Sequence, residues 1–163
     1  MDKASLKRLL PQDKEDVPRA AALVALGYPA VEPVLPQMLE WLKTHGSPVD
    51  LAMRGFFVAL GVPAVPVVRD ALRSRNDLLK YAVVTHVVAH WPGEAVKALQ
   101  SELQGLATGS GCYGTDLTAL KLLIEHRLAE QGWLAEWTRF KVDRLRELLG
   151  SAEELVVLLG DSA

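Results

Sequence analysis

A seven-residue segment occurs twice in this chain at a fixed separation. Residues 25–31 read ALGYPAV and residues 59–65, 34 positions later, read ALGVPAV, so six of seven positions are identical. Internal repeats with a period in the thirties are typical of stacked helical pairs, because one pair cannot bury its apolar face without a neighbour. The repeat therefore predicts an all-α protein.

Chain length and composition agree with that fold class. The 163 residues suit one domain, and the chain is 50% hydrophobic but only 6% aromatic. A core made mostly of Leu, Val and Ala favours packed helices over a sheet. We predict a single domain over residues 1–163, with helical pairs in 1–107, a glycine-rich loop in 108–115 and a C-terminal helical cap in 116–163.

Glycine and proline residues indicate where the helices begin and end. Gly27 and Gly61 are expected just beyond two helix C-termini, and Pro33 and Pro36 fit only the first turn of a helix. Gly132 and Gly150 are expected to break the C-terminal third, with Ser151 capping a short final helix. The expected helices cover residues 18–26, 31–43, 48–60, 64–73, 77–91, 94–106, 115–128, 133–149 and 151–159.

The apolar residues within these segments follow helical spacing. In the second segment the predicted buried stripe is Val34, Leu35, Met38, Leu39 and Leu42. The tetratricopeptide pattern does not fit, because Tyr28 follows the Leu-Gly pair at once rather than three residues later. We therefore expect a HEAT-like α-solenoid of about three to five antiparallel helix pairs with a divergent C-terminal cap.

Charge and cysteine content restrict the partners and the compartment. The formal net charge is −2, which gives no basic field to attract nucleic acid. Cys112 is the single cysteine, so the fold needs no internal disulfide, and no segment resembles a signal peptide or a membrane span. We expect a cytoplasmic protein that binds neither nucleic acid nor membranes and is a monomer or a weak homodimer.

Several short motifs carry a family resemblance. They are Leu9-Leu10-Pro11, Asp13-Lys14, Asp16, Pro33-Val34-Leu35-Pro36, Leu39-Glu40-Trp41-Leu42 and Pro48-Val49. In these the first hundred residues or so resemble a bacterial family of small HEAT-like proteins without assigned biochemical activity. Such families occur among presumed immunity proteins of polymorphic toxin systems, so the resemblance implies a protein partner, namely a cognate toxin. Ser47, Leu79 and Ala82 replace tryptophans of that family.

Three patterns suggest chemistry but lack its context. Residues 109–114 read GSGCYG and satisfy GxGxxG, yet a helix is expected before them instead of the required strand. His86 and His90 have zinc-ligand spacing, but Val87 stands where a metalloprotease needs Glu. Cys112 lacks an indicated base. We therefore expect no cofactor, no metal site and no catalytic residues, with a mobile loop carrying a free thiol.

The C-terminal third combines cations with aromatic residues. Two tryptophans, Trp133 and Trp137, are followed by four cations, Arg139, Lys141, Arg144 and Arg146. Proteins that bind single-stranded nucleic acids combine such aromatic and cationic side chains. Helical spacing gives another interpretation, because Trp133, Trp137 and Phe140 form a core stripe while interleaved acids neutralise a solvated face. The second interpretation is favoured.

The function expected from the sequence is non-enzymatic protein binding. In helical stacks the second helix of each pair lines the concave surface. The binding residues predicted there are Gln37, Glu40, Trp41, Thr44, Arg69, Asp70, Arg73, Lys97 and Ser101. Reversing the charges of Arg69 and Arg73 is expected to weaken binding without unfolding the protein. A nucleic-acid-acting or other enzyme on the same scaffold, and a structural adaptor, remain the alternatives.

Overall fold

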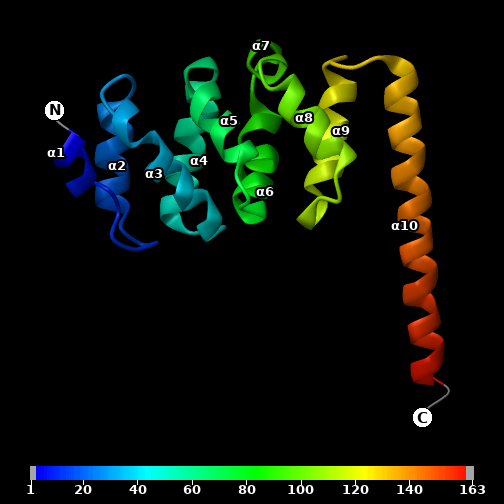
Figure 1. Cartoon of the computed structure of the whole chain (residues 1–163). Helices are drawn as coiled ribbons and strands as arrows, with labels where there is room; N and C mark the ends of the chain where they lie inside the picture. Colours follow the sequence, from blue (N-terminus) through cyan, green and yellow to red (C-terminus); the bar gives the residue numbers. More distant parts are fainter. Residues whose placement is uncertain (1–2, 161–163) are drawn as a thin grey trace.

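The computed structural model describes residues 3–160, and every regular element in this range is helical. The helices follow one another across the molecule in chain order, from α1 at one end to the long α10 at the other (Figure 1). The prediction of an all-α protein is confirmed. Across the same range, no single helix has both the length and the apolar character needed to cross a membrane.

The α-helices are mostly short, and 3-10 turns join several of them. The α-helices are α1 (Lys3–Arg8), α2 (Val17–Leu26), α3 (Leu35–Glu40), α4 (Pro48–Leu60), α5 (Val65–Arg73), α6 (Asp77–His86), α7 (Gly93–Lys97), α8 (Gln100–Thr108), α9 (Thr115–Glu125) and α10 (Gln131–Gly160). The 3-10 helices are η1 (Glu32–Val34), η2 (Trp41–Thr44), η3 (Val62–Ala64), η4 (Val88–His90) and η5 (Cys112–Gly114).

The sequence repeat corresponds to a structural repeat. Gly27 and Gly61 have positive φ angles of 64° and 61°, and each donates its N–H to the carbonyl four residues earlier, at Leu23 and Phe57. Glycine adopts positive φ without steric cost, so both helices can end there. Buried positions also recur at this offset, for example Val31 with Val65, Val34 with Val68 and Met38 with Leu72.

Three helix N-termini carry side-chain caps. The Asp16 carboxylate accepts from the Arg19 N–H, the Ser47 hydroxyl accepts from the Asp50 N–H, and the Asn76 amide oxygen accepts from the Leu79 N–H. Each cap satisfies an amide that has no partner within its own helix. Because these caps begin α2, α4 and α6, the first helix of each successive unit has a defined starting residue.

A continuous apolar core runs through these units. All five residues of the predicted stripe in the second segment are buried, from Val34 to Leu42. Trp91 is also buried, and its indole N–H donates to the Phe57 carbonyl at 2.9 Å. That bond joins the end of α4 to the turn after α6, so neighbouring units are held by a specific polar contact as well as by apolar packing.

Three predicted helices are divided in the structure, the first being the segment expected over residues 31–43, which is split into η1, α3 and η2. The segment expected over residues 77–91 ends as an α-helix at His86, because Val87 has φ −121° and ψ −66°, and η4 follows. The segment expected over residues 94–106 is split into α7 and α8. Five of the six residues 83–88 are β-branched, and β-branched residues have low helix propensity, which favours the early end of α6.

In the C-terminal third, the predicted break at Gly150 is wrong and the one predicted at Gly132 lies earlier, between the end of α9 at Glu125 and the start of α10 at Gln131. Gly132 and Gly150 lie inside one continuous helix, α10, and the Ser151 hydroxyl donates to the Glu147 carbonyl instead of capping a new helix. One glycine costs an α-helix only about 1 kcal/mol, so flanking helix formers can span it. The chain turns earlier, where Arg127 has φ 53° and the Glu130 carboxylate accepts from the Gly132 and Trp133 amides. These two hydrogen bonds hold the pKa of the Glu130 carboxyl below its ordinary value.

Candidate protein-binding surface

Four of the predicted binding residues line two grooves. Glu40 and Asp70 line a groove of about 240 Å³ where α3 approaches α5. Arg73 and Ser101 line a second groove of about 360 Å³ where α5 approaches α8. Both grooves include residues of α5 and α6, so the structure brings side chains from four α-helices, α3, α5, α6 and α8, onto adjoining surfaces.

Glu102 joins the two predicted arginines to α8. Its side chain is only 6% exposed, and Oε1 accepts from Nη2 of Arg73 at 2.6 Å and lies 3.5 Å from Nε of Arg69. Arg69 also donates from Nη2 to the Ala98 carbonyl at 2.7 Å. The structure changes the expectation for charge reversal at these arginines, because two new carboxylates would face a nearly buried Glu102 and destabilise the fold.

The remaining predicted residues differ in exposure. Trp41 is half-buried and packs against the core, and the Thr44 hydroxyl donates to the Trp41 carbonyl, so both contribute to local structure. Gln37 is half-buried with an unpartnered Oε1. Asp70, Lys97 and Ser101 are exposed. Glu40 is exposed as well and forms an ion pair with Lys43. Together with Arg73, which is 63% exposed, these four side chains are the accessible part of the predicted site.

A buried polar cluster beside the η2–α4 turn was not predicted from the sequence. The Asp50 side chain is fully buried, and its Oδ2 accepts from the Gly46 N–H at 2.8 Å and from Arg54 Nη2 at 2.5 Å. The His86 ring stacks on His45 with 5.1 Å between ring centroids. Asp50 Oδ1, Arg54 Nε and His86 Nε2 have no hydrogen-bond partner. The i, i+4 spacing of Asp50 and Arg54 was the available sequence signal.

The electrostatics of this cluster keep His86 neutral. Burial lowers the pKa of His86 below its ordinary value, and the nearby Arg54 and His45 lower it further. His90, the second member of the predicted i, i+4 pair, lies in η4 beyond the end of α6, so the two histidines do not share one helix. Among residues 3–160, no three His, Cys, Asp or Glu side chains are grouped where they could hold a metal ion.

The glycine-rich loop is fixed by contacts from α10. The loop follows helix α8, as predicted, but Lys141 donates from Nζ to the Gly109 carbonyl at 2.5 Å and to Asp116 Oδ2 at 2.7 Å. A Cβ at Gly111 would lie 2.6 Å from the Asp116 backbone nitrogen, so this position excludes other residues. Cys112 is exposed, and its thiol lies 3.6 Å from Asp77 Oδ2.

Lys141 corrects the prediction of a fully solvated basic face on α10. Its side chain is 9% exposed and paired with Asp116, which is 12% exposed. Two other cations on this helix have acidic neighbours, with Arg144 3.0 Å from Glu147 and Arg146 3.5 Å from Asp143. The interleaved acids therefore neutralise these arginines as the sequence predicts, whereas Phe140 is 55% exposed and does not join the predicted core stripe.

The fold and these surfaces define an all-helical protein with grooves between neighbouring helices. Comparison with protein-family models gives a more specific assignment. Residues 9–112 match the family described as a domain of unknown function, DUF5071, and because the match covers more than half of the chain, the protein belongs to that family. Comparison with curated proteins finds no match. The matched region extends from before α2 to the glycine-rich loop and includes both grooves.

Proposed function

We propose that the protein is a HEAT-like α-solenoid that binds another protein without catalysing a reaction. The solenoid arrangement is supported by the repeated glycine turns and by the repeated buried positions 34 residues apart. Contacts between helices are mostly short-range in the chain, such as α2 with α4, α5 with α6 and α8 with α9. Nearest-neighbour packing of this kind is the defining property of repeat proteins.

The observation that carries the binding proposal is the pair of adjoining grooves that share α5. Their lining includes Glu40, Asp70 and Arg73, so both signs of charge are present. The exposed Lys97 lies outside the two grooves, directly before Ala98, whose carbonyl accepts from Arg69. Mixed charge on an extended surface suits a protein partner, since electrostatic complementarity gives specificity and fixes orientation. The sequence resemblance makes a bacterial toxin the first partner to test.

Affinity capture with a charge-exchanged variant tests this proposal. The variant combines Asp70→Arg with Lys97→Glu, which leaves the net charge unchanged and does not alter the Glu102 contacts of Arg69 and Arg73. A matched control combines Lys14→Glu with Glu15→Arg, two exposed residues in the loop before α2.

The wild-type protein and the control should retain the same partner from native cells, and the groove variant should lose it. Equal retention by all three proteins would place the binding site elsewhere. Circular dichroism of each variant verifies that the helices are intact.

A further inference from the structure

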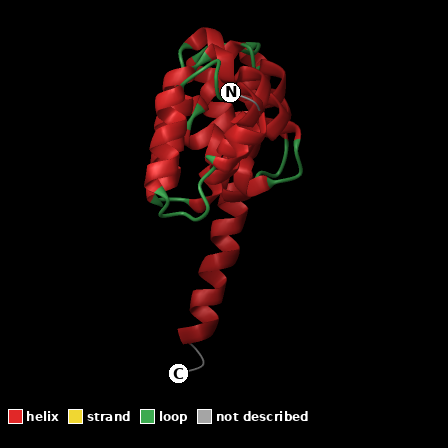
Figure 2. Cartoon of the chain, turned by 90° about the vertical axis from the view of Figure 1, so that its left-hand side faces the viewer, coloured by secondary structure: helices red, strands yellow, loops and turns green. Residues whose placement is uncertain are grey.

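The distal part of α10 presents an apolar stripe to solvent. Beyond its contact with α9, α10 extends away from the other helices (Figure 2). Along one face the stripe residues occur at intervals of three and four, and its five large side chains are between 39% and 74% exposed. The members of this stripe are Val142, Leu145, Leu149, Ala152, Val156 and Leu159.

This spacing is the heptad pattern of a coiled coil. Each heptad has two core positions, a and d. The a positions are Val142, Leu149 and Val156, and the d positions are Leu145, Ala152 and Leu159. The β-branched and leucine side chains at these positions are those that coiled-coil cores contain. An amphipathic helix gains most of its stability by burying its apolar face, so the distal part of α10 requires a covering surface.

We propose that the covering surface is α10 of a second copy of this chain, packed in the antiparallel direction. In this register Val142 faces Leu159 of the second copy, Leu145 faces Val156, and Leu149 faces Ala152. The overlap from residue 142 to residue 159 is about 27 Å long at about 1.5 Å per residue. The small Ala152 opposite Leu149 allows the two helices to approach closely where the two-fold axis crosses them.

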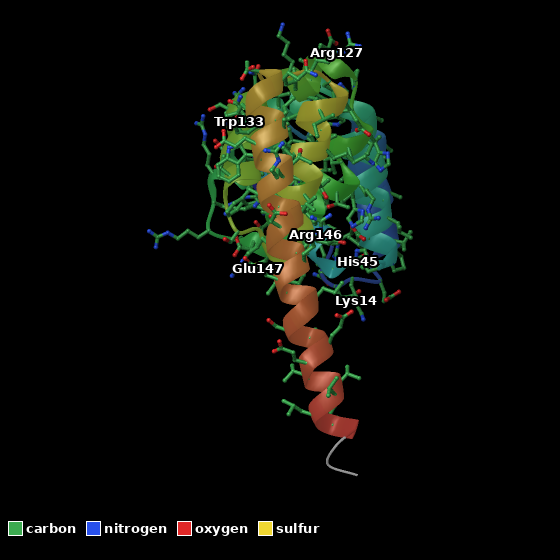
Figure 3. All side chains as sticks on the ribbon, turned by 90° about the vertical axis from the view of Figure 1, so that its right-hand side faces the viewer. Lys14, His45, Arg127, Trp133, Arg146 and Glu147 are labelled. Carbon is green, nitrogen blue, oxygen red and sulfur yellow. The ribbon has the colours of Figure 1, made fainter. Side chains whose placement is uncertain are left out.

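The residues beside the stripe favour this direction. On one side, Arg146 of each copy meets Glu153 of the other, and on the opposite side Leu148 meets Leu155. Leu148 and Leu155 are 55% and 62% exposed in the single chain. Arg146 lies near the point where α10 leaves the remaining helices (Figure 3), and its ion pair with Asp143 is 3.5 Å long and mostly exposed, so Arg146 can exchange partners at little cost.

A parallel pair would have the opposite character. In a parallel pair, heptad geometry would place Arg146 beside Lys141 of the second copy, so that two positive charges meet. It would also place the apolar Leu148 beside the acidic Glu153. Lys141 is also held by Asp116 and Gly109 and cannot turn away without breaking those contacts. Charge and apolar complementarity therefore both select the antiparallel arrangement.

Light scattering of the full chain over a range of concentrations tests the dimer. The wild-type protein should approach twice the mass of one chain as its concentration rises. Val156→Glu should remain monomeric, whereas the matched control Val157→Glu should dimerise as the wild type does. Val157 is adjacent in sequence and similarly exposed, at 62% against 69%, but its side chain points about 100° away from that of Val156 around the helix and does not belong to the stripe. A monomeric wild type, or equal loss in both variants, would overturn the proposal.

Charge exchange tests the register. Arg146→Glu and Glu153→Arg should each weaken dimerisation by about tenfold, because each places like charges together at two symmetric positions. The double variant should regain wild-type dimerisation, since the two exchanged positions would again carry opposite charges where they meet across the interface. Within one chain these positions are seven residues apart and too distant to pair. A double variant weaker than both single variants would overturn the antiparallel register.

Discussion

Replacing Lys141 with methionine should lower the free energy of unfolding by about 3 kcal/mol. Lys141 donates to the Gly109 carbonyl at 2.5 Å and to Asp116 at 2.7 Å, and methionine has similar length but cannot donate. The variant would leave the Asp116 carboxylate, 12% exposed, without its cation. Breaking a buried ion pair by removing one partner costs about 3–5 kcal/mol, and the residual exposure of both side chains places this pair at the lower end.

Urea denaturation followed by far-UV circular dichroism at neutral pH and fixed protein concentration measures this loss. The matched control is Lys121→Met, because Lys121 and Glu125 are 70% and 50% exposed and 3.6 Å apart, so their pair is worth at most about 0.5 kcal/mol. Adding Asp116→Asn to Lys141→Met should recover part of the stability by removing the unpaired charge. A Lys141→Met variant no less stable than the control would refute the reasoning.

Three further outcomes are expected. The pKa of His86 in the folded state is lowered below 6.5, its value in the unfolded chain, so at acidic pH the unfolded state binds more protons than the folded state. The free energy of unfolding should therefore fall as the pH decreases from about 7 to about 5. Thermal melts of His86→Gln should show a weaker pH dependence than the wild type; an identical dependence would contradict this. Trp91→Phe should cost about 1–3 kcal/mol in chemical denaturation by leaving the buried Phe57 carbonyl unpaired. No measurable loss would show that this bond is unimportant. Cys112→Ala should leave the melting temperature unchanged, and the exposed wild-type thiol should react with thiol reagents in the folded state; slow labelling would contradict its exposure.

The sequence predicted the helical units well where the signal was local. Gly27 and Gly61 end helices as predicted, because only the residues around them decide the turn. The buried stripe from Val34 to Leu42 also follows from periodicity within one segment. These features depend on short stretches of chain, so a single sequence is sufficient to find them.

Contacts between residues far apart in the chain could not be predicted from the sequence, and one helix break was predicted wrongly. Lys141 looked solvated because its partner Asp116 lies 25 positions earlier, and the contact of Arg69 and Arg73 with Glu102 spans about 30 positions. The break predicted at Gly150 was wrong because a single glycine is a weak helix breaker between strong helix formers. The contacts of Lys141, Arg69 and Arg73 depend on tertiary packing that no local pattern encodes.

Titration calorimetry with the purified partner decides whether the grooves along α5 form the binding site. The Asp70→Arg, Lys97→Glu variant should bind at least about tenfold more weakly than the wild type, which corresponds to about 1.4 kcal/mol. The Lys14→Glu, Glu15→Arg control should bind as the wild type does, because its substitutions lie outside both grooves. Equal affinity of the partner for all three proteins would contradict the proposed binding surface.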